Sequence, residues 1–119
     1  MNWRVELADE FVPEYRNLPT PVRRAILATT NILREHGPQL GRPHVDTLKG
    51  SRHANMKEMR FTAAEGEWRI AFAFDPDRNA ILLVAGDKSG HPSRRFYKGL
   101  IRKADDRFDR HLNQLIAKG

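Results

Sequence analysis

The chain has 119 residues, carries a net charge of +6 at pH 7 and contains no cysteine. This length fits a single domain over residues 1–119, with room for a hydrophobic core that needs no disulfides. The composition excludes a disulfide framework and a thiolate zinc site. The acidic start, MNWRVELADE, fits neither a secretory signal nor a membrane span. We therefore expect a cytoplasmic protein, and the positive charge favours an acidic partner such as nucleic acid.

The first part of the chain predicts a short strand followed by a helical hairpin. Residues 3–7 alternate apolar and polar side chains, as a strand does. Residues 9–18 begin with two acids, which suit a helix N-terminus, and then place apolar side chains on one helical face. Thr20 as N-cap and Pro21 behind it predict the start of a second helix, and residues 36–38 (His-Gly-Pro) predict its end.

The rest of the chain predicts an antiparallel meander and a long final helix. Turn-rich residues 41–55 contain one short candidate strand at residues 44–48. Three runs with period-two alternation follow, separated by turn signals at Glu65-Gly66 and at residues 76–79: NMKEMRFT, EWRIAFAFD and AILLVAGD. From Ser93 onward, apolar residues recur at helical spacing. The expected fold is α+β, in the order β-α-α-β-β-β-α, with the helices on one side of a small antiparallel sheet.

Alternation sorts the side chains of the middle strands onto two faces. The apolar face, which we expect beneath the helices, carries Trp68, Ile70, Phe72 and Phe74. Arg69 and two alanines point the other way, and we expect that face to be open, with a shallow groove beside the arginine. Glu58 and Arg60 of the preceding strand share the open face, whereas Lys57 lies at the rim of the core side.

Arg60 and Arg69 become neighbours if these two strands pair as a hairpin. Like charges opposite each other destabilise a sheet. The pair therefore indicates either an anion held between the arginines or an ion pair of one arginine with Glu58. The residues alone leave both interpretations open.

Positive charge is concentrated at the end of the chain. Residues 1–87 hold 12 Lys/Arg and 12 Asp/Glu, whereas residues 88–119 hold nine and three. The whole excess thus lies after Asp87, which favours a functional basic surface over the alternative of a solvated helix face. Arg94, Arg95 and Lys98 open the final helix, where the helix dipole prefers acids, so an anion is expected there.

The loop before that helix and the tyrosine within it add candidate residues. Lys88 lies between glycines, which allow close approach to a phosphate, and Asp87 either tethers it or caps the turn. His91 is a candidate acid–base group or simply a solvated loop histidine. Tyr97 either packs at the core edge or is placed to stack on a base or share a proton. The histidines show no metal-binding spacing, so no metal is expected.

Three segments together resemble the RelE/HigB-type toxins of type II toxin–antitoxin systems, and more narrowly their phage-derived HigB-like subgroup: GPQLGRPHVDTLKGSRHANMKEMRF, EWRIAFAFDPDRNAILLVAGDKSG and RRFYKGLIRKADDRFDRHL. The similarity runs from Trp3 to Leu115. It implies a RelE-like fold and a ribosome-dependent mRNA endonuclease that needs neither metal nor cofactor. The 2′-OH attacks the adjacent phosphate and leaves a 2′,3′-cyclic phosphate. The implied partners are messenger RNA, the ribosome and a helix-turn-helix, HigA-like antitoxin.

Together, the residues and the resemblance give a candidate site. The expected catalytic residues are Glu58, Arg60, Arg69, Lys88 and Tyr97, and the expected RNA-binding residues are Lys57, His91, Arg94, Arg95 and Lys98. Arg69 matches the arginine that contacts the scissile phosphate. Glu58 stands where the best-studied enzymes of the family carry a lysine, so Glu58, Lys57, His91 and Tyr97 all remain candidates for the general base. Two other functions remain open, a ParE-like gyrase-inhibiting toxin and a non-catalytic RNA- or partner-binding module of phage origin.

Overall fold

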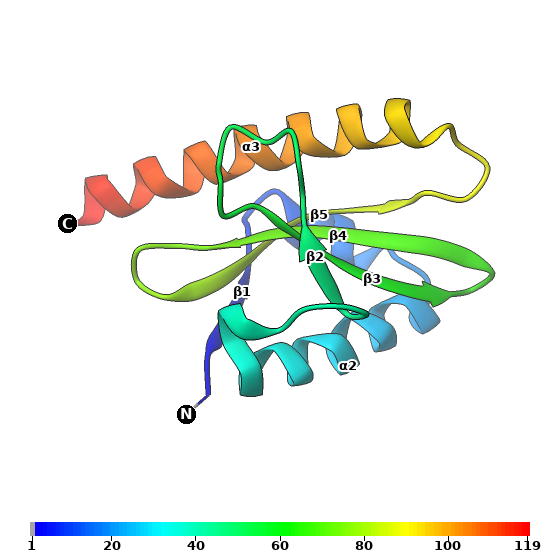
Figure 1. Ribbon diagram of the computed structural model, residues 1–119. Helices are drawn as coiled ribbons and strands as arrows, with labels where there is room; N and C mark the ends of the chain where they lie inside the picture. Colours follow the sequence, from blue (N-terminus) through cyan, green and yellow to red (C-terminus); the bar gives the residue numbers. More distant parts are fainter. Residues whose placement is uncertain (1) are drawn as a thin grey trace.

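The computed structural model describes residues 2–119, and within them five strands and three α-helices follow one another as β1-α1-α2-β2-β3-β4-β5-α3 (Figure 1). Their bounds are β1 Arg4–Leu7, α1 Phe11–Arg16, α2 Thr20–His36, β2 Val45–Thr47, β3 Lys57–Ala63, β4 Gly66–Phe74, β5 Asn79–Asp87 and α3 Ser93–Lys118. The expected α+β class is confirmed, and the candidate strand at residues 44–48 is present as β2. Among these residues, no helix is both long enough and apolar enough to cross a membrane.

The strands form one sheet in the order β1-β5-β4-β3-β2. All neighbours are antiparallel except β1 and β5, which run parallel. β5 lies inside the sheet, between β1 and β4, and its residues 80–84 are buried. The parallel pair was not expected, because strands distant in sequence give no local signal of their pairing.

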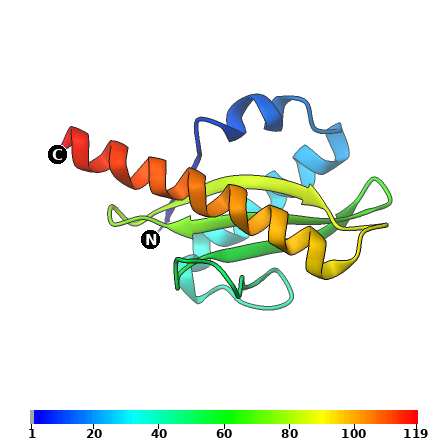
Figure 2. The ribbon, with the colours of Figure 1, turned by 90° about the horizontal axis from the view of Figure 1, so that it is seen from above.

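Helices cover both faces of the sheet, so the expectation of helices on one side was wrong. α3 lies above the sheet and α2 below it in Figure 1, and Figure 2 shows α3 crossing the strands. Ala71 and Ala73, expected on an open face, have no exposed surface. Small side chains here allow α3 to approach the sheet closely. Gly86 serves the same purpose, because a Cβ atom there would meet the Phe96 ring at 2.8 Å.

The core on the α2 side is built from the residues that alternation assigned to it. Ile70 and Phe72 of β4 are fully buried, together with Met59 of β3. The helices contribute further buried side chains, Phe11, Val22, Ile26 and Leu33. Burial of an apolar side chain of this size stabilises the fold by roughly 1.5–3 kcal/mol. The predicted apolar face of β4 is thus confirmed for its two central residues.

The predicted turns are present, with small shifts. The β3–β4 hairpin turns at Ala64 and Glu65, whose φ angles of 49° and 62° suit a two-residue type I′ turn, and Gly66 already belongs to β4. Thr20 is the first residue of α2, and Pro19 takes the N-cap position that we expected for Thr20. Gly37 ends α2 with a φ of +61°, as predicted.

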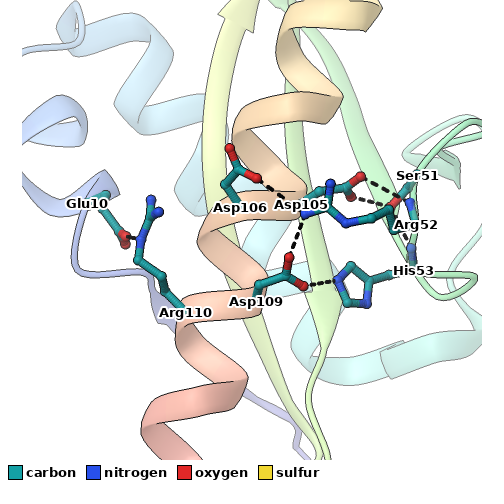
Figure 3. A network of polar contacts seen from close by, with 8 residues as sticks. All are labelled: Glu10, Ser51, Arg52, His53, Asp105, Asp106, Asp109 and Arg110. Atoms are coloured by element: carbon teal, nitrogen blue, oxygen red, sulfur yellow. Dashed lines mark hydrogen bonds and ion pairs between the residues drawn. The ribbon is translucent and has the colours of Figure 1, made fainter.

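The loop between β2 and β3 is fastened to α3 by a network of polar contacts (Figure 3). The buried Asp105 carboxylate accepts hydrogen bonds from the Ser51 hydroxyl and from the Arg52 amide, the latter at 3.0 Å. Asp109 pairs with the Arg52 guanidinium at 2.5 Å and with His53 Nε2 at 2.7 Å. These contacts join the middle of α3 to the β2–β3 loop.

A buried arginine fastens the opposite side of α3. Arg107 donates to both carboxylate oxygens of Glu14 in α1, at 2.6 and 2.7 Å, and to the Leu83 carbonyl at 2.8 Å. Leu83 lies at a β-bulge and has no partner residue in β4. Arg107 therefore satisfies a carbonyl that the ladder leaves unpaired. Together with the β2–β3 loop contacts, this fixes α3 over the sheet.

Candidate active site

Strand register brings charged residues together on the face beneath α3. Arg60 of β3 lies directly opposite Arg69 of β4, as we predicted for a hairpin. Glu58 pairs with Ala71, and Asp46 of β2 pairs with Glu58. Because paired residues point to the same side of a sheet, two acids and two arginines share this face.

Tyr97 from α3 completes the cluster. Its hydroxyl donates to Glu58 Oε1 at 2.8 Å and accepts from Arg69 Nε at 3.2 Å. Arg69 Nε lies 3.8 Å from the same Glu58 oxygen, and Arg60 lies 3.9 Å from Asp46. Of the two interpretations of the arginine pair, the ion pair with Glu58 is the one seen within the chain. Each arginine has a carboxylate nearby.

Burial raises the pKa values of both Glu58 and Tyr97. α3 leaves Glu58 and Arg69 each only 6% exposed, so these residues do not lie on an open face as expected. Burial raises the pKa of Glu58 above its ordinary value, although the hydrogen bond from Tyr97 and the charges of Arg60 and Arg69 oppose this. Burial, and then Glu58, also raise the pKa of Tyr97. Tyr97 is therefore a neutral phenol at pH 7.

A groove of about 360 Å³ adjoins this cluster and is lined by Arg42, Pro43, Arg60, Phe61, Thr62, Glu67 and Arg69. Arg42 holds Asp46 through two hydrogen bonds, at 2.7 and 3.1 Å, and lowers the pKa of that carboxyl. Sequence reasoning missed both residues. They lie in or beside a turn-rich stretch without periodicity, and only the pairing of β2 with β3 places them near Arg60.

Lys88 lies beside the cluster, with Nζ 5.8 Å from the centre of the Tyr97 ring. Asp87 caps the turn that carries it, because its Oδ1 accepts from the Ser89 amide, the Ser89 hydroxyl and the Glu67 amide. These bonds, the hydroxyl first, lower the pKa of Asp87. Of the two roles predicted for Asp87, turn capping is the one observed. His91 is exposed in the same loop.

Exposed basic residues continue from this loop along the first half of α3. Arg94, Arg95 and Lys98 are exposed, and none of them forms an ion pair with another described residue. Residues 88–103 hold six Lys/Arg and no acid, whereas residues 104–119 hold three of each. We call residues 88–103 the basic segment. The excess of positive charge that the sequence places in residues 88–119 therefore lies within residues 88–103.

Lys57 does not join the site. It pairs with Phe72, so its side chain leaves β3 on the α2 side, across the sheet from Glu58. Its position argues against Lys57 as the general base and separates it from the basic segment. The structure brings together the five expected catalytic residues, Glu58, Arg60, Arg69, Lys88 and Tyr97.

Histidines and carboxylates form pairs rather than larger clusters. His53 binds Asp109, and His111 binds Asp75 at 2.8 Å. Both rings also pack against Phe108. Within residues 2–119, no three His, Asp or Glu side chains are grouped closely enough to hold a metal ion.

Residues 13–109 match the family described as phage-derived Gp49-like proteins (DUF891). The candidate toxin HigB2 of Mycobacterium tuberculosis is 49% identical over 90 residues, which are 75% of this chain but 44% of HigB2. The chain therefore spans less than half the length of HigB2. The candidate toxin HigB3 of the same organism is 44% identical over 88 residues, covering 74% of this chain and 75% of HigB3.

Two solved structures share the fold. An arginine double mutant of the E. coli toxin RelE in the free state superposes with a TM-score of 0.63 and 14% identity, over 90% of this chain and 98% of that one. A chain of the archaeal RelE–RelB complex of Pyrococcus horikoshii superposes with a TM-score of 0.53 and 23% identity, over 76% of this chain and 99% of that one. At these identities the likeness concerns the fold alone.

Proposed function

The chain belongs to the family of phage-derived Gp49-like proteins and is of the RelE/HigB toxin type, and from this premise we propose that it is the toxin of a type II toxin–antitoxin pair that cleaves messenger RNA on the ribosome. The observation that carries the proposal is the groove lined by Arg60 and Arg69 beside the Tyr97–Glu58 hydrogen bond. Cations and an acid–base pair thus lie side by side.

The arginines suit a phosphate that is being cleaved. A guanidinium has five N–H donors, and Arg69 uses one on Tyr97 and one on the Trp68 carbonyl. The remaining donors, with Arg60 and Lys88, can stabilise the negative charge that grows on the phosphate oxygens in the transition state. Preorganised donors of this kind typically contribute about 10²–10³-fold each.

The Tyr97–Glu58 pair suits the removal of a proton. A ribose 2′-OH that loses its proton attacks the adjacent phosphorus and forms a 2′,3′-cyclic phosphate, while the 5′ oxygen leaves as a hydroxyl. A carboxyl whose pKa is raised by burial is a stronger proton acceptor than one in water. The proposed reaction uses only these side chains, without metal or cofactor.

The proposed partners are messenger RNA, the ribosome and a helix-turn-helix antitoxin of the HigA kind. The basic segment supports the first two, because exposed, unpaired Lys and Arg provide the sequence-independent part of nucleic-acid binding. The solved complex of an archaeal RelE with RelB concerns that protein. For this chain an antitoxin is part of the proposal.

Controlled expression in cells, with messenger 5′ ends mapped, tests the function. The wild type should arrest growth and produce new 5′ ends within translated codons. Arg69→Ala and the more exposed Arg60→Ala should abolish both effects, because each removes phosphate stabilisation. Arg78→Ala is the matched control, since this exposed arginine lies in the β4–β5 turn at the other end of β4 and should behave as the wild type.

Two outcomes would contradict the proposal. Unchanged growth and unchanged 5′ ends on expression of the wild type would exclude a ribonuclease toxin. Growth arrest with intact messages and altered DNA supercoiling would instead identify a gyrase-inhibiting toxin.

A further inference from the structure

We propose that Tyr97 is the group that meets the ribose 2′-OH, and that Glu58 acts behind it by accepting the Tyr97 proton. This inference rests on the proposed ribonuclease function and assigns the proton path within it. Glu58 then becomes a residue that acts through Tyr97, and Tyr97 becomes the catalytic residue.

The position of Glu58 places it behind Tyr97. Its partners on the neighbouring strands are Asp46 of β2 and Ala71 of β4, and α3 covers it from above. Glu58 is 6% exposed, whereas Tyr97 is only partly buried, at the first turns of α3. Tyr97 therefore presents more surface to a substrate than Glu58 does, and its hydroxyl is bonded to Arg69, which lines the groove.

The hydrogen bonds fix the direction in which a proton can move. A phenol has one hydrogen and two lone pairs. The Tyr97 hydrogen is donated to Glu58 Oε1 and one lone pair accepts from Arg69 Nε, which leaves one lone pair for an incoming hydroxyl. Proton transfer from a 2′-OH to Tyr97 can thus be coupled to transfer of the Tyr97 proton to Glu58.

The cleavage step needs no reagent other than water. The 2′ oxygen gives its proton to the Tyr97 oxygen, and Tyr97 gives its own proton to Glu58. The 2′ oxygen bonds to phosphorus as the bond from phosphorus to the 5′ oxygen breaks, and the leaving oxygen takes a proton from water. Tyr97 ends as a neutral phenol and Glu58 as a carboxylic acid, which then returns its proton to solvent.

Neither residue suits the task alone. A phenol whose pKa is raised does not act as a base at neutral pH, and a carboxylate covered by a helix is kept from the substrate. The Arg69 guanidinium at 3.2 Å, with Lys88 near the ring, stabilises the negative charge that Tyr97 carries in transit. The charged and titratable groups that face this pair are Asp46 from β2, Arg60 from β3, Arg69 from β4 and Lys88 from the β5–α3 loop.

A double-mutant cycle on programmed ribosomes tests the relay. Single-turnover cleavage is measured for the wild type, Glu58→Gln, Tyr97→Phe and the double variant, with folding monitored by circular dichroism. Each single variant should lose about 10²–10⁴-fold in rate, the usual contribution of a general base. The double variant should be no slower than the less active of the two single variants, because both substitutions remove the same proton path. Tyr15→Phe, in α1, is the control and should cleave as the wild type.

The pH profile separates a relay from a structural role. In Glu58→Gln the rate should recover partly at high pH, where Tyr97 loses its proton to water, whereas Tyr97→Phe should show no such recovery. A rate for Tyr97→Phe within about threefold of the wild type would overturn the relay, because it would mean that Glu58 takes the proton directly. Losses that multiply in the double variant would also overturn it. Absence of cleavage by the wild type would refute the ribonuclease function itself.

Discussion

At residue 58, the stability of the fold and the proposed chemistry make opposite demands. The pKa of Glu58 is raised in the folded state, so the folded protein holds this proton more tightly than the unfolded chain does. The stability that results is present below the unfolded pKa, near 4.3 in water, and is lost as the pH rises through the folded value. At neutral pH the ionised carboxylate therefore lowers stability.

Glu58→Gln should accordingly be at least as stable as the wild type at pH 7 while losing cleavage. The amide oxygen still accepts from Tyr97 and the buried charge is removed. Urea unfolding at pH 7 and near pH 4 measures this, and any advantage of the variant should shrink at the lower pH. Glu65→Gln, in the exposed hairpin turn, should not differ from the wild type. If Glu58→Gln lowered the free energy of unfolding at pH 7 by more than about 1 kcal/mol, the typical cost of a single substitution, the argument would be contradicted.

At the scale of elements, the sequence predicted each strand and helix better than it predicted their layers. Alternation in β4 separated Ile70 and Phe72 from Arg69, and the arginine pair with Arg60 followed from the hairpin. Ala71 and Ala73 are compatible with an empty groove and with a closely packed helix alike, because a small side chain permits both. The decision depends on contacts far apart in sequence, which local pattern does not contain.

The same limit applies to the candidate site. Glu58, Arg69 and Tyr97 were predicted individually, and Tyr97 lies near the others only because α3 crosses this face. Arg42 and Asp46 were missed because they carry no periodic signal. Lys57 was assigned to the RNA-binding residues, although strand parity already placed it on the other side of β3 from Glu58.

The contacts between α3 and the β2–β3 loop predict a stability effect at Asp105. Asp105→Asn should destabilise the fold by about 1–3 kcal/mol, because the buried amide group meets the Arg52 N–H and the Ser51 hydroxyl with fewer acceptors. Urea denaturation measures it. Asp106→Asn, whose side chain is about half exposed, is the matched control and should stay within about 0.5 kcal/mol of the wild type. Equal stability of the two variants would show that these buried bonds contribute little.

At the scale of the whole molecule, charge is segregated by the way in which α3 is used. Its three acids, Asp105, Asp106 and Asp109, follow the basic segment, and all three bind the β2–β3 loop. The first half keeps its basic residues exposed. The last 16 residues hold equal numbers of basic and acidic side chains. The full net charge of +6 therefore lies on the basic segment.

RNA binding should therefore depend on salt through the basic segment. Lys98→Ala should weaken binding uniformly across sequences and reduce the slope of log K against log salt concentration by about 1, as expected for one lost phosphate contact. Lys57→Ala, on the α2 side of the sheet, should leave the slope unchanged. Fluorescence anisotropy with labelled single-stranded RNA measures both. Equal changes of the slope in the two variants would show that RNA binding depends on the net charge of the protein and not on the position of the lysine.

The central claim is that the cluster of Arg60, Arg69, Tyr97 and Glu58 cleaves messenger RNA by attack of the 2′-OH. Analysis of the product ends after incubation of the purified protein with programmed ribosomes tests it most directly. We expect a 2′,3′-cyclic phosphate on one fragment and a 5′-hydroxyl on the other, and we expect the Arg69→Ala variant to form neither. Intact messages, or fragments that end in a 5′-phosphate, would contradict it.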